Sequence, residues 1–456
     1  MTVINLSIDK SPRSWYNILS DMGGLPEPKG KEAIERLGQY GIKECLRQEF
    51  SDQRYVPIPD ELQKIYEQVL RPRPLVRAER LEKALHLPEG KIRLYYKRED
   101  LSPTGSHKVN TALAQAYFAA KEGKEKLVTE TGAGQWGSAL AFGAMLNNLD
   151  PTVFWVRSVY NWKNDRKTFM QLMGAEVLAS PSDRTEIGRK LLKEWNEKNG
   201  NANHPGSLGI AISEGIETAL KDEKSVYSLG SVLNHVLMHQ TVIGQETREQ
   251  FRMVDDYPDY MISCLGGGSN FGGFILPFAG EVLRGEAEKD VKFVAAQSQS
   301  APNLSRGEYR YDFADHGEIT PQLKMLTLGH QTSMIPIKGD GLRYHAAAPI
   351  ISKLKAEHKM IETIAYPIDE KHVFERGVMF FQNEGVLPAS ESNYSAACAI
   401  DHALKLKEEW EQGKFDEKVI AFNISGHGTL DMMGYAEVLG NKLGRRISVD
   451  DLERLL

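Results

Sequence analysis

Cysteine is scarce in this chain: Cys45, Cys264 and Cys398 are its only three among 456 residues. They lie far apart, are odd in number and form no CxxC pair. This pattern excludes a disulfide framework and a CxxC metal site within the chain. Unpaired thiols are typical of a reducing compartment, so we expect a cytoplasmic protein.

An excess of positive charge and long apolar runs are also missing. The 56 Lys and Arg residues are outnumbered by 62 Asp and Glu, and the formal net charge is −6. No basic field for nucleic acid is therefore expected. The longest apolar stretches, such as Phe271–Gly280, are too short to cross a bilayer and contain Gly and Pro. The N-terminus lacks the apolar core of a signal peptide, so we expect neither a membrane nor a nucleic-acid partner.

What the chain does have is the length and alternation of a two-domain α/β protein. At 456 residues it exceeds the size at which one hydrophobic core stops growing. From Arg93 onward, β-rich runs alternate with helical periodicity, which predicts parallel strands with helices on both faces. The expected strands are Arg93–Tyr96, Leu127–Glu130, Thr152–Val156, Glu176–Leu178, Tyr260–Cys264, Lys292–Ala296 and Val419–Asn423, and the expected helices include Val109–Glu122, Ser138–Leu146, Arg166–Met173, Phe274–Leu283, Pro349–Glu357 and Ser392–Glu411.

Two long stretches interrupt this alternation. A long helical stretch is expected near Val232–Phe251, and an irregular region is expected from Gln297 to about Lys338. We place the boundary of two α/β domains within the helical stretch, with an N-terminal domain over residues 1–235 and a C-terminal domain over residues 236–456.

The first of three glycine-rich turns matches the pattern of a dinucleotide site. Gly132, Gly134 and Gly137 form GxGxxG between an expected strand and an expected helix. That fingerprint also needs an acidic residue about 20 positions later, whereas the next strand ends at Arg157. An NADP site that uses Arg157 is one interpretation, and a different use of this turn is the other.

The second turn, Gly266–Asn270, opens an expected helix directly after a strand. Its backbone N–H groups can converge on a phosphate, which the helix N-terminus also favours. Phe271 stands where GxGxxG needs its last glycine, and the GK[ST] ending of a nucleotide P-loop is missing. A compact phosphate monoester therefore suits the turn better than a dinucleotide. The alternative is a tight turn that needs glycine only for packing.

Three polar side chains stand where such folds place their chemistry. Ser425 follows the last expected strand, in the third glycine-rich turn, and a hydroxyl there faces the ligand crevice. Lys108 stands in the first turn of an expected helix, where a cation is disfavoured. A lysine that is disfavoured as a cation has a lowered pKa, and its neutral amine is the form that makes a Schiff base. Glu130 ends an expected core strand, where burial favours general acid–base work. Solvent-exposed positions are the alternatives for Lys108 and Glu130.

His235 and His239 stand four residues apart on an expected helix, a spacing that zinc ligands use. The glutamate of HExxH is missing and no clear third ligand follows. This pattern favours a structural pair and no metal.

Taken in order, these segments resemble the tryptophan synthase β-chain family. KREDLSPTGSHKVN (Lys97–Asn110) is similar to the cofactor-lysine motif of that family. The likeness continues in ETGAGQWG (Glu130–Gly137), LMGAEV (Leu172–Val177), LGGGSN (Leu265–Asn270), EGVLPASES (Glu384–Ser392) and NISGHG (Asn423–Gly428). It extends from about Pro72 to Gly434, whereas the first seventy residues match poorly.

The resemblance implies a fold-type-II pyridoxal-phosphate enzyme, in which two three-layer αβα domains hold the cofactor in the cleft between them. A segment near residues 74–106 is expected to cross into the other domain. The implied reaction condenses L-serine with indole to give L-tryptophan and water through an aminoacrylate intermediate, which makes the chain a lyase of tryptophan biosynthesis. A homodimer and a monovalent cation bound by backbone carbonyls are also implied.

The resemblance also assigns roles to residues. Lys108 carries the cofactor and removes the α-proton, and Glu130 is the acid–base group for loss of the hydroxyl and for activation of indole. Ser425 bonds the pyridine nitrogen; since a hydroxyl leaves the ring a milder electron sink than an aspartate does, β-replacement is favoured over transamination. The expected phosphate ligands are His107, Gly266, Gly267, Gly268, Ser269 and Asn270, and the expected substrate turn comprises Thr131, Gly132, Ala133, Gly134, Gln135 and Trp136.

Three departures resemble the divergent second type of β chain. Where the common type has an aspartate in GLDYPG, this chain has Arg343 in GLRYH. An arginine suits an anionic leaving group, so O-phosphoserine is an alternative donor. An Arg343 that faces solvent or pairs with a glutamate is the other interpretation. Trp136 replaces the histidine of GAGQHG, which reshapes the indole pocket. The tail GHGTLD and the N-terminal region also differ, which predicts weak association with an α chain and the use of free indole.

Other activities remain open on the sequence. A serine or threonine deaminase, or an O-acetylserine-type synthase, shares the same intermediate, although Glu130 argues against both. An NADP-dependent oxidoreductase leaves Lys108 without a role. A non-catalytic partner subunit has no need of Lys108, Glu130 and Ser425 together.

Overall fold

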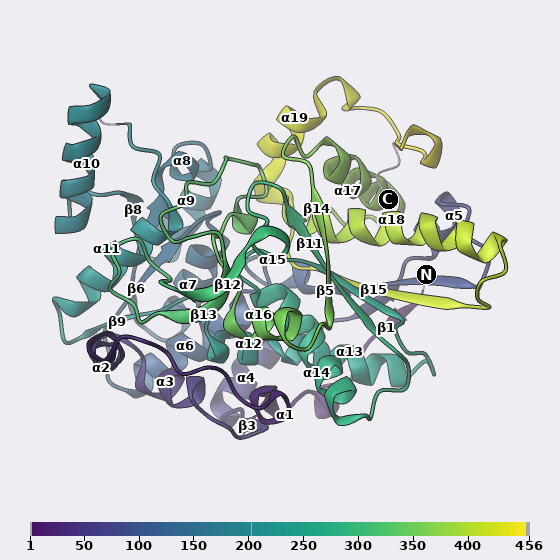
Figure 1. Cartoon of the computed structure of the whole chain (residues 1–456), viewed down its shortest axis with the longest axis horizontal. Coiled ribbons are helices and arrows are strands. Elements are labelled where there is room, and N and C mark those ends of the chain that lie inside the picture. Colours follow the sequence, from purple (N-terminus) through teal and green to yellow (C-terminus); the bar gives the residue numbers. More distant parts are fainter. Residues whose placement is uncertain (1, 202, 453–456) are drawn as a thin grey trace.

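Two β-sheets organise the computed structural model, which describes residues 2–201 and 203–452 (Figure 1). The first sheet has four parallel strands in the order β8-β7-β6-β9. It comprises β6 (Lys126–Thr131), β7 (Asp150–Val156), β8 (Glu176–Ser180) and β9 (Ser225–Tyr227). Strand and helix alternate along this part of the chain, as the sequence predicts.

Helices cover both faces of the four-stranded sheet. Because successive strand residues point to opposite faces, Val153 and Trp155 of β7 pack with α9, while Phe154 packs with α11. The main helices on the two faces of this sheet are α7 (Gln135–Leu146), α9 (Asn164–Leu172) and α11 (Leu208–Leu220), and α10 (Glu186–Asn199) packs on α11. The result is a three-layer αβα arrangement.

The second sheet has seven strands in the order β1-β4-β5-β15-β10-β11-β14. Its core is parallel, and β1 and β4 are antiparallel to their neighbours. The strands are β1 (Val3–Ile4), β4 (Leu75–Arg77), β5 (Ile92–Arg98), β10 (Tyr260–Cys264), β11 (Lys292–Ser298), β14 (Ile361–Tyr366) and β15 (Lys418–Ile424). In Figure 1 this sheet fills the right half of the molecule.

Two pairs of helices enclose the seven-stranded sheet. On β10, Met261 packs with the apolar side chains of α14 (Ser269–Arg284) and α13 (Val242–Arg252). Its neighbour Ile262 packs with α17 (Lys371–Glu384) and α18 (Ser392–Glu411) on the opposite face. This is a second three-layer αβα unit.

The chain crosses between the two units more than once. Strands β4 and β5 come from the first hundred residues, yet β5 pairs with β15 of the seven-stranded sheet. The boundary at residues 235 and 236 stays a prediction.

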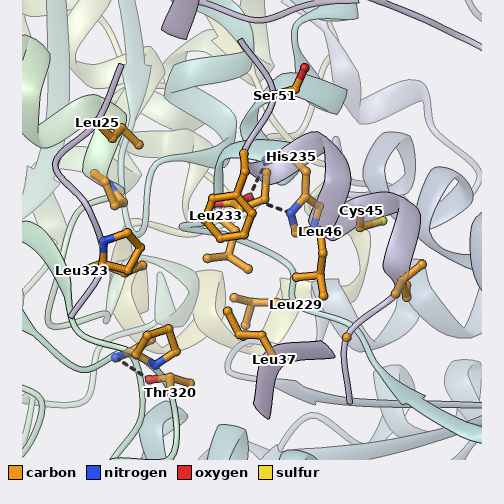
Figure 2. A pocket seen from close by; sticks show the side chains of 18 of the residues that line it. Leu25, Leu37, Cys45, Leu46, Ser51, Leu229, Leu233, His235, Thr320 and Leu323 are labelled. Carbon is orange, nitrogen blue, oxygen red and sulfur yellow. Dashed lines mark hydrogen bonds and ion pairs between the residues drawn. The ribbon is translucent and has the colours of Figure 1, made fainter. Parts of the chain in front are cut away.

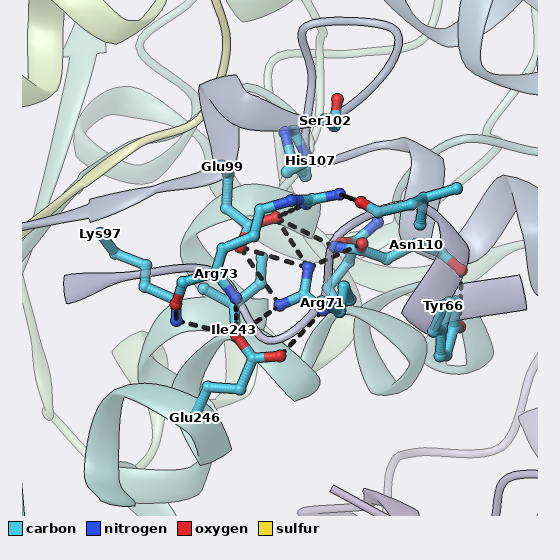
Figure 3. Close-up of polar contacts among 12 residues, drawn as sticks. Tyr66, Arg71, Arg73, Lys97, Glu99, Ser102, His107, Asn110, Ile243 and Glu246 are labelled. Carbon is cyan, nitrogen blue, oxygen red and sulfur yellow. Dashed lines mark hydrogen bonds and ion pairs between the residues drawn. The ribbon is translucent and has the colours of Figure 1, made fainter. Parts of the chain in front are cut away.

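A buried ion network joins these crossing segments (Figure 3). Arg71 pairs with Glu99 at 3.0 Å and with Glu246 of α13 at 2.9 Å. Lys97 at the end of β5 also reaches Glu246, at 2.8 Å. Asn110, in the first turn of α6 (Val109–Lys121), accepts a hydrogen bond from Arg71. The network therefore fixes the start of α6 against α13.

The remaining elements connect or flank the two units. Figure 1 shows the N-terminal helices along the lower edge, below both sheets. The full set of remaining elements is α1 (Leu19–Met22), α2 (Lys31–Tyr40), α3 (Lys43–Glu49), α4 (Asp60–Gln68), α5 (Glu79–Ala84), α8 (Arg157–Tyr160), α12 (Asn234–Gln240), α15 (Asn303–Arg306), α16 (Pro349–Ala356), α19 (Met432–Leu439) and the paired strands β2 (Ser14–Tyr16) and β3 (Tyr55–Pro57). Among the described residues, no helix has the length and apolar character needed to span a membrane.

The prediction of an irregular region from Gln297 to about Lys338 is wrong. It contains an antiparallel pair of strands, β12 (Glu308–Asp312) and β13 (Leu323–Thr327). Most residues of β12 are only partly buried, so the strand lacks an apolar run that would mark it in the sequence. The expected helical stretch near Val232–Phe251 is divided at Thr241 into α12 and α13.

Candidate active site

A pocket lies where the loops after β5, β6, β10 and β15 meet, at the carboxyl ends of strands from both sheets. This is the usual place for a ligand in an open α/β fold. Its wall contains every site residue predicted from the sequence except Gly134. Residues far apart in the chain, from His107 to Ser425, therefore share one pocket.

Lys108 precedes the first residue of α6, and its Nζ donates to the carbonyl of Gly230 at 3.0 Å. Burial lowers the pKa of Lys108 to about 8, and the carboxylate of Glu130 only partly opposes this effect. At pH 7 roughly a tenth of this side chain is thus a neutral amine, far more than for an ordinary lysine, and a Schiff base forms from the neutral amine. The lowered pKa was expected from the helix position, but burial is its largest cause.

Glu130 is the penultimate residue of β6 and is 3% exposed. It accepts a hydrogen bond from the hydroxyl of Tyr227. Burial raises the pKa of Glu130 to about 7, although the bond from Tyr227 and the charge of Lys108 lower it. A carboxyl that titrates near neutral pH can both give and take a proton.

The glycine turn Gly266–Asn270 forms the opposite wall, directly before the 16-residue helix α14. A Cβ on Gly266 would lie 2.4 Å from the carbonyl oxygen of Gly341, and one on Gly267 would lie 2.5 Å from Ser231 Oγ. The first N–H groups of a helix have no partner within it. Close packing and free N–H groups together make this turn a phosphate cradle.

His107 and Asn270 brace the cradle in different ways. His107 Nε2 lies 3.2 Å from Ser269 Oγ, and burial lowers the pKa of His107 to about 3, so the ring is neutral. The Asn270 amide donates to Ser263 Oγ and to the carbonyl of Cys264, and its oxygen accepts from Asn423. The Asn270 side chain therefore fixes the turn, which leaves its backbone N–H to face a ligand.

Ser425 follows β15 directly and lines the pocket. Its hydroxyl lies 2.8 Å from Ser392 Oγ and 3.7 Å from Cys264 Sγ. Burial raises the pKa of Cys264 to about 11, so its thiol stays neutral. Ser425 therefore offers a ligand in the pocket an uncharged hydroxyl, whose neighbours are a second hydroxyl and a neutral thiol.

The turn after β6 is ordered by Thr131, whose Oγ1 accepts the N–H groups of Gly134 and Gly137 at 3.2 Å each. The N–H of Gly134 is therefore used inside the turn rather than offered to a substrate. Gly134 instead faces the buried ring of Trp155, from which a Cβ on Gly134 would lie 2.6 Å away. The N–H groups of Gly132, Ala133, Gln135 and Trp136 remain for a carboxylate.

Trp136 packs against the backbone of Gly230, where a Cβ would lie 2.3 Å from its ring. The indole N–H of Trp136 donates to Thr129 Oγ1 at 2.6 Å. Trp136 thus supports Gly230, whose carbonyl accepts the hydrogen bond from Lys108 Nζ.

Arg343 lines the pocket, and its partner there was not predicted. Arg343 pairs with Asp340 at 2.9 Å, while Lys163 lies 3.8 Å from the same carboxyl group. Burial raises the pKa of Asp340 to about 6. An acid three residues before Arg343 therefore lines the same pocket.

Glu391 is a second pocket residue that the sequence reasoning missed. It accepts from the Gln135 amide at 2.8 Å and from the Gly341 N–H at 2.9 Å. Its only sequence signal is the segment EGVLPASES, to which no role was assigned. Glu391 joins the substrate turn to the Arg343 loop.

Arg157 and the pair His235 and His239, which the sequence offered for an NADP site and a zinc site, lie outside the pocket wall. Arg157 donates to the carbonyls of Ala179 and Pro181 and lies outside the pocket wall, so it is not placed to bind an NADP phosphate beside Gly132. Both ring nitrogens of His239 are engaged, by Thr111 and Gln48, and His235 pairs with Glu49 at 2.8 Å. The two histidines make structural contacts.

A larger cavity of about 520 Å³ adjoins the pocket and is lined mainly by apolar side chains (Figure 2). Leu37, Leu46, Leu229, Leu233 and Leu323 contribute to its wall. Leu229 also lines the smaller pocket, so the two spaces share a wall.

The residues of the pocket fit pyridoxal phosphate. The cradle at α14 suits a phosphate monoester, Lys108 provides an amine with a lowered pKa, and Ser425 provides a neutral hydroxyl. These are the three attachment points that such a cofactor needs.

Comparison with known proteins agrees with this class of site. Residues 66–426 match the family model described as pyridoxal-phosphate dependent enzyme. The fungal L-serine ammonia-lyase of Rhizomucor miehei shares the fold at 15% identity and a TM-score of 0.58, over 82% of this chain and 98% of the other. Maize serine racemase is similar at 16% identity and a TM-score of 0.53, over 83% and 97%.

Closer relatives narrow the class. The tryptophan synthase beta chain of Thermococcus gammatolerans is 50% identical over 95% of this chain and 96% of its own length. The tryptophan synthase beta chain 2 of Methanothermobacter thermautotrophicus is 49% identical over 97% and 100%. This chain therefore belongs to the pyridoxal-phosphate-dependent enzymes and, within them, to the tryptophan synthase β-chain family.

Proposed function

We propose that this chain catalyses the pyridoxal-phosphate-dependent β-replacement in which L-serine and indole give L-tryptophan and water. The observation that carries the proposal is that Lys108 and Glu130 face one pocket, with pKa values moved toward neutrality from opposite sides. The phosphate cradle at Gly266–Asn270 completes the site. We propose that the pocket residues have the roles predicted from the sequence, with one change. Gly134 does not bind the substrate carboxylate but shapes the turn, because its N–H is bonded to Thr131.

The reaction needs four proton transfers, two by Lys108 and two by Glu130. Neutral Lys108 takes the proton from Cα of serine, and bound pyridoxal phosphate supplies the electron sink for the pair left behind. Protonated Glu130 gives its proton to the departing hydroxyl, which leaves as water. The resulting carboxylate then takes the proton that indole loses as its carbon joins Cβ. Lys108 finally returns its proton to Cα, so the atoms balance and both groups regain their starting states.

The test is product analysis of the purified holoprotein with L-serine and indole. We expect tryptophan from the wild type, and neither tryptophan nor the visible band of lysine-bound cofactor from Lys108→Ala. Pyruvate without tryptophan would identify a deaminase instead, and a thioether product would identify an O-acetylserine-type synthase.

O-phosphoserine is a second candidate donor because Arg343 lines the pocket. Its guanidinium is already paired with Asp340 at 2.9 Å, so a phosphate has to displace that carboxylate. We therefore favour serine. Comparing kcat/KM for the two donors in wild type and Arg343→Ala decides the matter, because a selective loss for O-phosphoserine identifies Arg343 as its ligand.

We further propose a cytoplasmic homodimer that binds an α chain weakly, uses free indole and holds a monovalent cation through backbone carbonyls. Three unpaired, buried thiols support the reducing location, and the apolar cavity beside the pocket supports an apolar co-substrate. The family resemblance supports the rest. Sedimentation of the chain with and without an α chain tests the assembly, and activity in different alkali salts tests the cation.

A further inference from the structure

The phenol of Tyr227 is in direct contact with Glu130, to whose Oε2 it donates a hydrogen bond. Tyr227 ends β9, which pairs with β6 so that Val128 lies opposite Tyr227, two residues before Glu130. The Tyr227 side chain is buried, and it comes from a strand that carries none of the family-like segments.

Thr129 is the other hydroxyl near this carboxylate, with Oγ1 3.2 Å from Glu130 Oε2. Its one proton has a closer acceptor in the carbonyl of Ser228, at 2.5 Å. Thr129 Oγ1 also accepts the indole N–H of Trp136 at 2.6 Å. Because Thr129 is occupied by Ser228 and Trp136, Tyr227 is the hydroxyl that serves Glu130.

The ring of Tyr227 is confined on two sides. Gly215 of α11 lies against it, where a Cβ would come within 2.8 Å of Cε2. The ring of Tyr40 meets it edge to face, with centroids 6.1 Å apart and an interplanar angle of 76°. A ring packed between a helix backbone and a second ring keeps its hydroxyl in one place relative to Glu130.

The electrostatics keep Tyr227 a donor throughout the titration of Glu130. Burial and the Glu130 carboxylate raise the pKa of Tyr227 well above its ordinary value, so the phenol stays protonated. A hydrogen bond donated to a carboxylate favours its ionised form and lowers its pKa. The other ionisable groups that face this pair are Lys108 of α6, Tyr344 after the short helix Asp340–Leu342, and Tyr40 of α2 behind the phenol.

We propose that Tyr227 is a positioning residue for Glu130: its hydroxyl fixes Oε2, so that Oε1 acts on the reacting groups in the pocket. The inference rests on the proposed function, because Glu130 is the acid–base group only in that reaction. It adds a residue that lines the apolar cavity beside the pocket and that sets the protonation of Glu130 through a direct hydrogen bond.

The test is Tyr227→Phe, which removes the hydroxyl and keeps the ring. In the full chain without cofactor, the carboxyl infrared band that Glu130→Gln abolishes reports the titration of Glu130 directly. We expect the titration midpoint to move upward by about one to two pH units, the equivalent of one hydrogen bond to a charged group. In the holoprotein, the alkaline limb of the kcat profile, where Glu130 loses the proton that it gives to the departing hydroxyl, moves upward by the same amount.

Tyr40→Phe is the matched control. Among the described residues the Tyr40 hydroxyl is buried without a hydrogen-bond partner, so its removal should leave the titration of Glu130 in place. A ring-fluorinated tyrosine at position 227 is a stronger donor and should move the midpoint downward, which tests the proposal even if Tyr227→Phe does not fold.

An unchanged midpoint in Tyr227→Phe, or equal shifts in Tyr227→Phe and Tyr40→Phe, overturns the inference. The outcomes for function are separate. If the wild type makes no tryptophan but the midpoint moves, the proposed function fails and the contact with Glu130 stands. If tryptophan forms and the midpoint is fixed, the function stands and the role of Tyr227 fails.

Discussion

The side-chain amide of Gln135 donates a hydrogen bond to Glu391 Oε2 over 2.8 Å, which joins the turn after β6 to the residue that precedes α18. The other oxygen of Glu391 accepts from the N–H of Gly341 at 2.9 Å. One carboxylate thus connects loops from both sheets across the pocket.

Replacing Glu391 with alanine should loosen these loops. The Gln135 amide and the Gly341 N–H lose their acceptors, at about 1 to 3 kcal/mol for a buried group. We expect the free energy of unfolding to fall by about 2 to 4 kcal/mol in urea titrations, and KM for the amino-acid donor to rise. Glu391→Gln retains an acceptor oxygen and should lose less; equal losses in both variants would contradict this account.

The stability of the chain should depend on pH through Glu130. Burial raises its pKa to about 7, whereas an ordinary glutamate in an unfolded chain titrates near about 4.3. Between these values the folded state binds a proton that the unfolded state has released, so stability falls as pH rises. Relative to Glu130→Gln, the wild type should lose on the order of 3 kcal/mol from about pH 4.3 to about pH 7. Unfolding curves of the two proteins that stay parallel across this range would refute the prediction.

The ion network around Glu99 should be costly to break. Glu99 is fully buried and pairs with Arg71 and Arg73. Removing one partner of a buried ion pair costs about 3 to 5 kcal/mol, because uncompensated charge remains. We expect that loss for Glu99→Gln in chemical unfolding. The exposed pair Lys193–Glu197 provides the control, since Lys193→Ala should change stability by less than about 0.5 kcal/mol.

Cofactor affinity should depend on the glycine at one end of α14 and not on the glycine at the other. Gly268 precedes α14 with a φ of +121°, and Gly285 follows it with a φ of +70°. Alanine is strained at either position. Gly268→Ala also puts a methyl group in the phosphate turn, so it should raise the Kd for pyridoxal phosphate, measured from the visible absorbance. Gly285→Ala should leave that Kd unchanged, and comparable losses would point to a general effect on α14.

Much of the fold could be predicted because local periodicity coincides with burial. The predicted bounds of β10 and α18 agree with the structure, since each is an apolar element between clear breaks. Strand β14 and helix α17 were not predicted. The middle of β14 is only partly buried, and α17 carries Gly377 in its interior, where the side chain of Asn393 fills the space of a Cβ.

The site could be predicted only where chemistry follows a strand or a glycine turn. Lys108 and Glu130 stand at such positions. Asp340, Glu391 and Tyr227 do not; their importance comes from what they contact, which is Arg343, Gln135 and Glu130 respectively. Partners that meet only in three dimensions leave no periodicity or spacing in the sequence, so they appear only once the chain is folded.

The position of β5 in the seven-stranded sheet bears on how the chain is made. Its neighbours are β4, which is near in sequence, and β15, with Ile92 opposite Lys418. While a ribosome synthesises the residues in between, β5 has one unpaired edge, because its second neighbour does not yet exist. An exposed strand edge pairs readily with other chains. The nascent protein therefore needs its last strand, or a chaperone in its place, before the strand that leads to Lys108 is safe from aggregation.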